Sequence, residues 1–598
     1  VPEVARLAAA AGDVVVLRVP DSTERGKAVA FEWSQTQGPA VQLHDIKTAR
    51  AHFIMPATAP NAVAGDDAPL AFAVKLTYGD GTVEAKGVGI TTLHTTTPGT
   101  TPPPAVLRDV VVFAADKDLN GRVDLYRARL DGSEVIRLNG PLAPNGNVQT
   151  FTVSPDGTRV VYLADQDAAG VFELYVARVD GSDTRKVSGT LVAGGSVSFQ
   201  FRWAPDSSRI AFVADKLTDN VLELFTVRPD GSDNVRVSGP MVPGGFFLDS
   251  AWAPDSSRIA YTASQFTAGV VELFVSRADG SDNRRVSGPM TAGGGVQFGF
   301  AWAPDSSRLA YRADQRTDDI VELFTVRPDG SSNLRVSGPL VTGGAVFDFA
   351  WAPNGSRIAY RADALIDNVV QLFSVRPDGT GNTQVSSVPP TGDVFDFLWA
   401  PDSSRIAYRA DQITDDVVEL FTSGPDGSGN VRVNGALVAG GGVSNYAWAP
   451  DSSRIAYVAD QNTDNSFELF TSRPDASGNV RASGPPPASG ISGLSFIWSP
   501  DSAWIGYLAA QRSNTVELFT TRPDGSLNPL VSGAMTIGGN ASAFLWTRDG
   551  TRLVYRADQR VQNQFELFTS APDGGAPNIA VSGPLTLDGD VFGFAVPQ

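Results

Sequence analysis

One seven-residue string, Trp-Ala-Pro-Asp-Ser-Ser-Arg, recurs in nearly the same form along most of this 598-residue chain. Its proline stands at Pro205, Pro254, Pro304, Pro353, Pro401, Pro450 and Pro500, and drifted copies are centred on Pro155 and Arg548. Successive copies lie 48 to 50 residues apart. This period falls in the range of β-propeller blades and exceeds that of leucine-rich or ankyrin repeats. The chain is therefore expected to fold into a ring of similar β-sheets.

Each repeat reads as four short strands. In the unit that begins at Val346, the first predicted strand is 346–351, where Phe347, Phe349 and Trp351 alternate with smaller residues. Pro-Asn-Gly and Pro-Asp-Gly turns separate the further strands, which are expected at 357–362, 371–376 and 384–387. The unit shows no helical periodicity of useful length. A four-stranded antiparallel blade is the expected structure.

The tryptophans indicate how neighbouring blades pack. Eight of the ten occupy the end of the first predicted strand, and the residue before them is often alanine. Facing sheets interdigitate large side chains with small ones, so the tryptophan face of one blade should meet the alanine face of the next. We therefore interpret these tryptophans as core residues and not as ligand-stacking groups.

The two ends of the repeat array predict how the ring closes. Residues 110–113, 124–126 and 135–138 supply the second to fourth strands of a first blade that lacks its tryptophan strand. Residues 590–596 match 393–399, and only Pro597 and Gln598 follow them in the sequence. The C-terminal strand should complete the first blade, which closes the ring and removes its edges. Nine full units and this composite unit predict ten blades.

Composition excludes several function classes. The chain has no cysteine, and its three histidines, His44, His52 and His94, all lie near the N-terminus. Thiolate nucleophiles, cysteine-bound zinc, and histidine-dependent triads in the repeat region are therefore excluded. The net charge is −18, and the chain therefore lacks the excess of basic residues that is typical of a nucleic-acid binder. No apolar run approaches the ~20 residues of a membrane helix, so no membrane span is expected.

Residues before the repeats form a separate predicted module. Strands are expected at 14–19, 28–34, 41–43, 51–55, 70–77 and 87–93. The stretch from Trp33 to Leu43, with Phe53, Pro56 and Tyr78-Gly79-Asp80-Gly81, resembles a PKD-type immunoglobulin-like sandwich, with Trp33 in its core. The resulting domain prediction is a sandwich at 1–94, a Thr/Pro-rich linker at 95–105, and a propeller at 106–598.

The repeat itself resembles the WD40-like repeat of TolB-type β-propellers. The resemblance rests on Trp-Ser/Ala-Pro-Asp-Ser/Gly-Ser-Arg-Ile-Ala-Tyr, followed by Glu-Leu-Phe-Thr-Val-Arg-Pro-Asp-Gly, over residues 106–598. It implies an all-β fold and a bacterial exported protein that is periplasmic, exposed on the cell surface or secreted. It also implies partners among envelope or surface proteins, whereas the oligomeric state is left open. Fold alone does not specify function.

Acidic loops between the second and third strands suggest a metal. Carboxylates at alternate positions with a glycine in the turn suit a hard cation such as calcium. The sharpest loop offers Asp116, Asp118, Asn120 and Asp124, and the next offers Asp165, Asp167 and Glu173. Later loops, such as the one with Asp411, Asp415, Asp416 and Glu419, are degenerate. The competing interpretation is that these aspartates satisfy backbone N–H groups in turns.

No catalytic or organic-cofactor residues stand out from the repeat. Near-identity of the units argues against one specialised catalytic site, so we expect a non-enzymatic interaction or scaffold protein. A glycan- or small-ligand-binding propeller is the alternative, and a carboxylate-based hydrolase is a further one. Exposed aromatic side chains around the channel mouth would favour ligand binding, and a cleft where one blade departs from the repeat would favour an enzyme. The candidates for a small-molecule site are Asp249, Asp348, Asp396 and Asn445.

Overall fold

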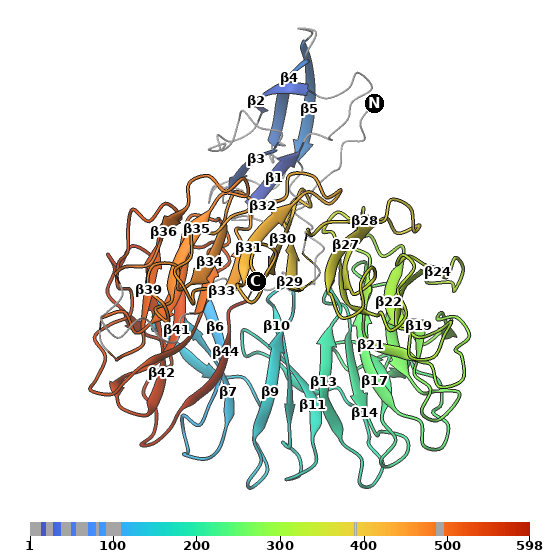
Figure 1. Ribbon diagram of the computed structural model, residues 1–598. Helices are drawn as coiled ribbons and strands as arrows, with labels where there is room; N and C mark the ends of the chain where they lie inside the picture. Colours follow the sequence, from blue (N-terminus) through green and yellow to red (C-terminus); the bar gives the residue numbers. More distant parts are fainter. Residues whose placement is uncertain are drawn as a thin grey trace. The chain divides into compact units, whose positions relative to one another are not determined.

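The computed structural model (Figure 1) describes residues 109–597 except 388, 390, 486–494 and 513. Before residue 109 it describes five segments, 14–18, 28–37, 50–54, 70–78 and 83–90. The chain divides into two compact units, Val1–Pro103 and Pro104–Gln598. All regular elements in the described ranges are strands. Within these ranges, no helix has the length and apolar character needed to cross a membrane.

The N-terminal unit contributes two small antiparallel sheets. Strand β1 (Val14–Arg18) pairs with β3 (Arg50–Ile54), and β2 (Ala28–Gln37), β4 (Leu70–Tyr78) and β5 (Val83–Ile90) form the other sheet. β5 begins before the expected start at 87. The predicted strand 41–43, the linker 95–105, His44, His94 and the side chains of Trp33 and His52 lie outside the described residues. The PKD-type sandwich therefore stays a prediction.

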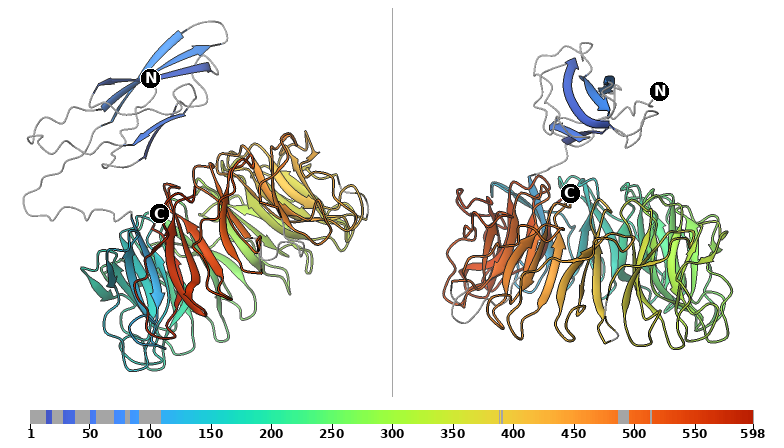
Figure 2. Two further views of the ribbon diagram at one scale, coloured as in Figure 1. Left: turned by 90° about the vertical axis from the view of Figure 1, so that its left-hand side faces the viewer. Right: turned by 45° about the horizontal axis from the view of Figure 1, so that its top comes forward.

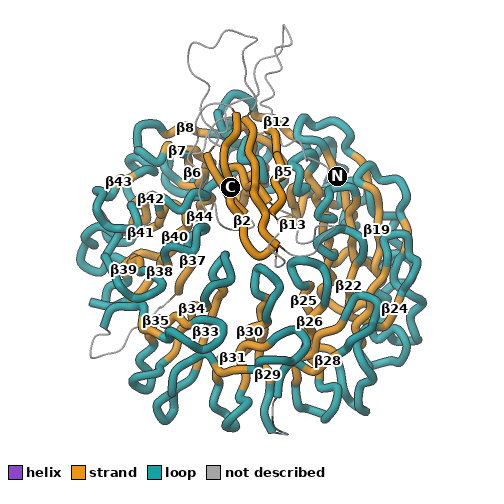
Figure 3. The backbone as a smooth tube through the Cα atoms, turned by 90° about the horizontal axis from the view of Figure 1, so that it is seen from above, coloured by secondary structure: helices purple, strands orange, loops and turns teal. Residues whose placement is uncertain are grey.

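The second unit is a ten-bladed β-propeller, as the repeat predicts. Its strands pair in ten separate antiparallel sheets, which we number as blades 1 to 10 in chain order. Nine sheets have four strands, and blade 9 has three plus one bridge between Phe519 and Leu530. In Figure 3 the strands of blade 10 follow one another from the inside of the ring to its edge in the order β40, β41, β42 and β43.

The strand bounds follow the repeat closely. The inner strands are β44 (Val591–Ala595), β9 (Val148–Val153), β13 (Val197–Trp203), β17 (Phe247–Trp252), β21 (Val296–Trp302), β25 (Val346–Trp351), β29 (Val394–Trp399), β33 (Val443–Trp448), β37 (Ser495–Trp498) and β40 (Ala541–Trp546). The second strands are β6 (Val110–Ala115), β10 (Arg159–Ala164), β14 (Ile210–Ala214), β18 (Arg258–Ala263), β22 (Leu309–Ala313), β26 (Ile358–Ala362), β30 (Ile406–Ala410), β34 (Ile455–Ala459), β38 (Ile505–Ala509) and β41 (Leu553–Val561).

The outer strands shorten toward the edge of each blade. The third strands are β7 (Asp124–Arg129), β11 (Glu173–Arg178), β15 (Glu223–Val227), β19 (Glu272–Arg277), β23 (Glu322–Val326), β27 (Gln371–Val375), β31 (Glu419–Ser423), β35 (Glu468–Ser472), β39 (Glu517–Thr521) and β42 (Gln564–Ser570). The fourth strands are β8 (Val135–Arg137), β12 (Thr184–Lys186), β16 (Val235–Arg236), β20 (Arg284–Arg285), β24 (Leu334–Arg335), β28 (Thr383–Gln384), β32 (Val431–Arg432), β36 (Val480–Arg481) and β43 (Ile579–Ala580).

The fourth strand of the Val346 unit differs from the prediction. It was expected at 384–387, but β28 ends at Gln384. Beyond it, the backbone N–H groups of Val385 and Ser386 both donate to the Leu372 carbonyl, and the Ser386 hydroxyl accepts from the Leu372 N–H. Because a serine side chain replaces the strand partner, the ladder stops after two residues.

The C-terminal strand closes the ring in the predicted way. β44 pairs antiparallel with β6, and Phe594 stands opposite Phe113. In Figure 1 the red β44 lies beside the blue β6, and the second view in Figure 2 shows the blades following one another around the ring. Within the described residues, blade 1 thus has all four strands although its sequence is split between the two ends of the repeat region.

Tryptophan-to-alanine packing between blades is also confirmed. Trp302 of blade 5 shares a buried cluster with Ala251 and Ala260 of blade 4, and its indole N–H donates to the Ala251 carbonyl at 3.1 Å. Each of the eight repeat tryptophans makes the equivalent bond to the preceding blade. Seven of them are buried, and Trp351 is half-buried. The indoles therefore join neighbouring blades both by packing and by hydrogen bonds.

Candidate functional site: the acidic rim

One end of the ring carries the loops that the sequence singled out. We call this end the acidic rim; it comprises the loops between second and third strands and the loops that enter the first strands. Asp165 shows how the two sets are joined, because its carboxylate accepts the Asn147 N–H at 2.6 Å and the Gly170 N–H at 2.9 Å. Seven blades repeat this pair of bonds, through Asp116, Asp165, Asp215, Asp363, Asp411, Asp460 and Asp558.

The four predicted ligands of the first loop have different environments. Asp116 is buried and accepts the Gly121 and Asp590 N–H groups, and buried Asp124 bonds Arg122 and Asn139. Asp118 and Asn120 are exposed. The structure therefore gives Asp116 the turn-stabilising role that the competing interpretation expected, whereas Asp124 bonds two side chains. Calcium at this loop stays a prediction.

The second loop brings two of its three predicted ligands together around a cation of the chain itself. The Lys186 ammonium lies 3.0 Å from both the Asp167 and the Glu173 carboxylates. Burial opposes the charge of Lys186, but its hydrogen bonds to these carboxylates raise its pKa above the ordinary value. In other blades an arginine of the fourth strand takes the same place, as Arg481 does beside Glu468 at 2.9 Å. The third predicted ligand, Asp165, points to the backbone instead.

The degenerate loop of blade 7 has the tightest group of carboxylates. Oxygen atoms of Asp411, Asp415 and Asp416 lie within 4.8 Å of one another, which is the single such group of three among the described residues. Asp411 is nevertheless bonded to the Asp416 and Asp393 N–H groups, as in the other blades.

The inner strands enter the acidic rim through irregular pairing. In blade 6, Val346 pairs with Ala362 and Asp348 with Arg361, so Phe347 is an extra residue in a β-bulge. A bulge re-aims the side chain it carries. Phe395 and Phe592 are bulge residues in blades 7 and 1, and Phe199 and Phe298 lie in longer irregularities of blades 3 and 5. These five rings are 40 to 68% exposed. The inner strands therefore carry the exposed aromatic side chains that the sequence analysis associated with ligand binding.

Arginines of the second strands hold these bulges in place. The Arg361 guanidinium bonds Asp348 of its own blade, with Nη2 to Oδ2 at 2.6 Å, and donates to the Val394 carbonyl of the next blade at 2.9 Å. Arg409 repeats both contacts, with Asp396 and with Val443. Arg312 donates to the Val346 carbonyl at 3.1 Å, and burial lowers its pKa.

The four candidate small-molecule residues are therefore not equivalent. Asp348 and Asp396 are neutralised within their own blades, and Asp249 lies 3.3 Å from Arg202 of the preceding blade. Asn445 accepts the Tyr446 N–H at 2.8 Å and is otherwise exposed. Each of the three carboxylates thus already has a cation of the chain as its partner.

Exposed apolar side chains concentrate on the acidic rim. Of the large apolar residues that are exposed in the described propeller, all but four lie in or next to the rim loops or at the irregular starts of the inner strands; the four are Leu334, Leu398, Ile497 and Leu527. Leu365, Ile366 and Ile413 are rim examples from blades 6 and 7. Sequence reasoning missed this asymmetry, because Phe347, Phe349 and Trp351 alternate regularly in the sequence and the bulge that exposes Phe347 leaves no signal there.

Comparisons with known proteins find similar folds at low identity. No family model and no curated protein matches the sequence. TolB from Acinetobacter baumannii is 12% identical over 52% of this chain and 74% of that chain, with a TM-score of 0.25. Dipeptidyl peptidase 4 of Porphyromonas gingivalis is 12% identical over 74% and 64%, with a TM-score of 0.42. Oligogalacturonate lyase of Vibrio parahaemolyticus is 13% identical over 61% and 98%, with a TM-score of 0.32. The solved structures similar to this chain thus include TolB propellers and enzymes.

Proposed function

We propose that this chain is a non-enzymatic protein-binding propeller that engages its partner through the acidic rim. The observation that carries the proposal is the gathering of exposed apolar residues at that end of the ring. Exposed apolar surface rimmed by polar groups is typical of protein–protein interaction sites. The proposal includes a location in the periplasm, on the cell surface or outside the cell, which the resemblance to TolB-type repeats supports.

Blades 5 to 7 have the chemistry that a basic and apolar partner segment would recognise. Phe298, Phe347 and Phe395 are exposed on three consecutive inner strands. The adjoining loops add five exposed carboxylates, Asp318, Asp319, Asp367, Asp415 and Asp416. Aromatic faces attract arginine and lysine, and nearby carboxylates complement the same charges. The proposed partner is therefore a protein segment rich in arginine or lysine with apolar neighbours.

The absence of enzymatic activity is part of the proposal. Hydrolysis by carboxylates needs a pair of which one is protonated and the other is free to act. At the candidate positions, Asp348 and Asp396 instead each accept hydrogen bonds from both Nε and Nη2 of one arginine. This pairing favours a structural role for both carboxylates.

Co-purification from the source organism's envelope and surface fractions tests the proposal. The full chain is compared with a Phe347→Ser/Phe395→Ser variant and with a Leu334→Ser/Leu527→Ser control, whose exposed residues lie away from the rim. A partner should be recovered with the wild type and the control, and its affinity should fall about tenfold or more with the rim variant. High salt should further weaken the binding of this partner, because it screens the attraction between basic residues and the rim carboxylates. Equal recovery with both variants, or recovery of no partner, would overturn the proposal.

A further inference from the structure

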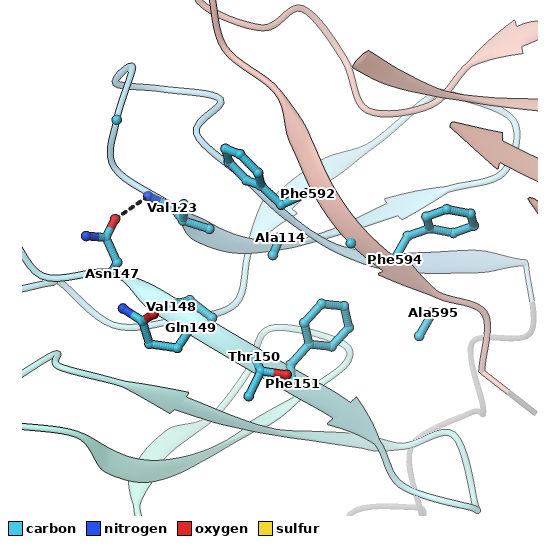
Figure 4. A pocket seen from close by; sticks show the side chains of 12 residues that line it. Ala114, Val123, Asn147, Val148, Gln149, Thr150, Phe151, Phe592, Phe594 and Ala595 are labelled. Carbon is cyan, nitrogen blue, oxygen red and sulfur yellow. Dashed lines mark hydrogen bonds between the residues drawn. The ribbon is translucent and has the colours of Figure 1, made fainter. Parts of the chain in front are cut away.

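A pocket of about 730 Å³ opens between the inner strands of blades 1 and 2 (Figure 4). Phe592 and Phe594 line it from β44, and Gln149, Thr150 and Phe151 line it from β9. The volume lies within the range of small-molecule sites. This seam lies apart from blades 5 to 7, which carry the proposed protein contact.

The pocket exists because blade 1 departs from the repeat at one cross-strand pair. Ala114 stands opposite Gly593, where blade 6 has Arg361 opposite Asp348. A Cβ added to Gly593 would meet no atom within 4 Å. Every other blade has a larger residue than alanine at the second-strand position, namely Leu163, Val213, Thr262, Arg312, Arg361, Arg409, Val458, Leu508 and Arg556. Side chains that fill the space elsewhere are missing at this seam.

The small side chain of Ala114 also leaves two backbone carbonyls of the next blade without a side-chain donor. In blade 7, the carbonyls of Val394 and Phe395 accept the Arg361 guanidinium. The counterparts of these carbonyls in blade 2 are those of Val148 and Gln149. The Ala114 side chain is too short to reach them, and no side chain among the described residues donates to either carbonyl. The Gln149 amide and the Thr150 hydroxyl likewise have no hydrogen bond within the described part of the chain. The pocket is therefore lined both by hydrogen-bonding groups and by aromatic rings.

No titratable side chain is found among the described residues that line the pocket. A charged ligand would consequently lack a counter-charge there, and the net charge of −18 disfavours an anion further. The lining also lacks the carboxylate pair that glycoside hydrolysis needs, so the pocket is suited to binding and not to cleavage.

The geometry points to a binding site for an uncharged oligosaccharide. A pyranose has apolar C–H faces that pack on Phe592 and Phe151, and hydroxyl groups at its edge that donate to carbonyls and bond the Gln149 amide. Both halves of that chemistry are present in the pocket, and a charged sugar or a purely apolar ligand would use only one of them. This site goes beyond the proposed protein contact and does not depend on it.

Calorimetric titration of the full chain with neutral tetrasaccharides of glucose, mannose, galactose and xylose tests the inference, with a galacturonate tetrasaccharide as the charged probe. The blocking variant is Ala114→Arg/Gly593→Asp, which copies the Arg361–Asp348 pair that blade 6 already accommodates. A second variant, Phe592→Ala, removes one ring. Phe395→Ala is the matched control, because it removes a bulge phenylalanine from another seam.

At least one neutral tetrasaccharide should bind the wild type and the Phe395→Ala control with equal affinity. Both pocket variants should weaken it about tenfold or more while their melting temperatures stay close to the wild type. The inference is overturned if no neutral probe binds, if the galacturonate probe binds more tightly, or if the blocking variant binds unchanged. Because the Phe347→Ser/Phe395→Ser variant leaves this pocket intact, loss of the protein partner and loss of the sugar are distinguishable.

Discussion

The hydroxyl of Thr569 donates a hydrogen bond to the carbonyl oxygen of Leu130, 3.1 Å away and 439 residues earlier in the chain. The same bond joins consecutive blades within the array, for example from Thr422 to the Pro474 carbonyl at 2.6 Å. The contact between blades 10 and 1 thus repeats the contact between ordinary neighbours. Closure of the ring therefore adds one more inter-blade interface of the usual kind, and β44 makes that interface possible.

Removal of β44 should open the ring. A chain that ends before Val591 leaves β6 without its inner partner and exposes a sheet edge. We expect association through that edge and a lower melting temperature, measured by light scattering and calorimetry. A synthetic peptide of residues 588–598 should restore the monomer, whereas a scrambled peptide should not. A truncated chain that stays monomeric with the wild-type melting temperature would contradict the closure argument.

Substitutions at Trp399 should separate packing from hydrogen bonding. Its indole N–H donates to the Ala350 carbonyl at 3.1 Å, and its ring is buried beside blade 6. Trp399→Phe keeps most of the packing and should cost about 1 kcal/mol of unfolding free energy. Trp399→Ala also leaves a cavity and should cost about 3–5 kcal/mol. Urea denaturation measures both, and equal costs would show that packing against the alanine face contributes little.

Buried tyrosines should make the propeller sensitive to alkali. Burial raises the pKa of Tyr261, Tyr311, Tyr457 and Tyr507 from 10.0 to about 12. Since the unfolded chain ionises first, their stabilising contribution is complete below pH 10 and is lost as the pH rises from 10 to about 12. Each group costs about 1.4 kcal/mol per pH unit in that window. Tyrosinate absorbance should therefore rise together with unfolding, and Tyr261→Phe should reduce the slope. Free titration near pH 10 in the folded protein would refute this.

The calcium prediction can be tested with a substitution at Asp118, which leaves the hydrogen bonds of the turn intact. Asp118 is exposed and its ion-pair partner is Lys117 at 3.7 Å, whereas Asp165 holds two backbone N–H groups. If calcium binds the first loop, EDTA should lower the melting temperature of the wild type and Asp118→Asn should remove that difference. Calcium at one hundred times its Kd would add about 2.7 kcal/mol. Asp165→Ala should lower the melting temperature with or without EDTA. A wild type that melts identically in calcium and EDTA contradicts the prediction.

Features that recur in every blade could be predicted from the sequence, whereas features that arise where one blade departs from the repeat could not. The period, the Trp302–Ala251 packing and the β44–β6 pairing all follow from recurring residues, because each blade solves the same packing problem. The acidic loops were recognised, but a carboxylate that binds a cation and one that binds backbone N–H groups have the same sequence pattern. The pocket was not predicted, although the ring closure was, because the two small residues that create it, Ala114 and Gly593, differ from the repeat at a single cross-strand pair.

Glu517 of blade 9 lacks the fourth-strand arginine that pairs with the equivalent glutamate in blades 3, 4, 5, 7 and 8. Glu468 of blade 8 lies 2.9 Å from Arg481, thirteen residues later, but Leu530 stands at the corresponding position after Glu517. Burial raises the pKa of Glu517 above 4.5 although the charge of Arg512 opposes the shift, and its Oε2 atom has no hydrogen-bond partner among the described residues. A raised carboxyl pKa means stability that is complete below pH 4.5 and lost as the pH rises through the folded pKa.

Leu530→Arg should remove this loss and add about 1 kcal/mol at neutral pH, allowing for partial exposure. Urea denaturation across pH 4 to 7 measures it, and Arg481→Leu should create the same defect at Glu468. An unchanged pH profile in Leu530→Arg would show that Glu517 is already satisfied by other means, such as solvent.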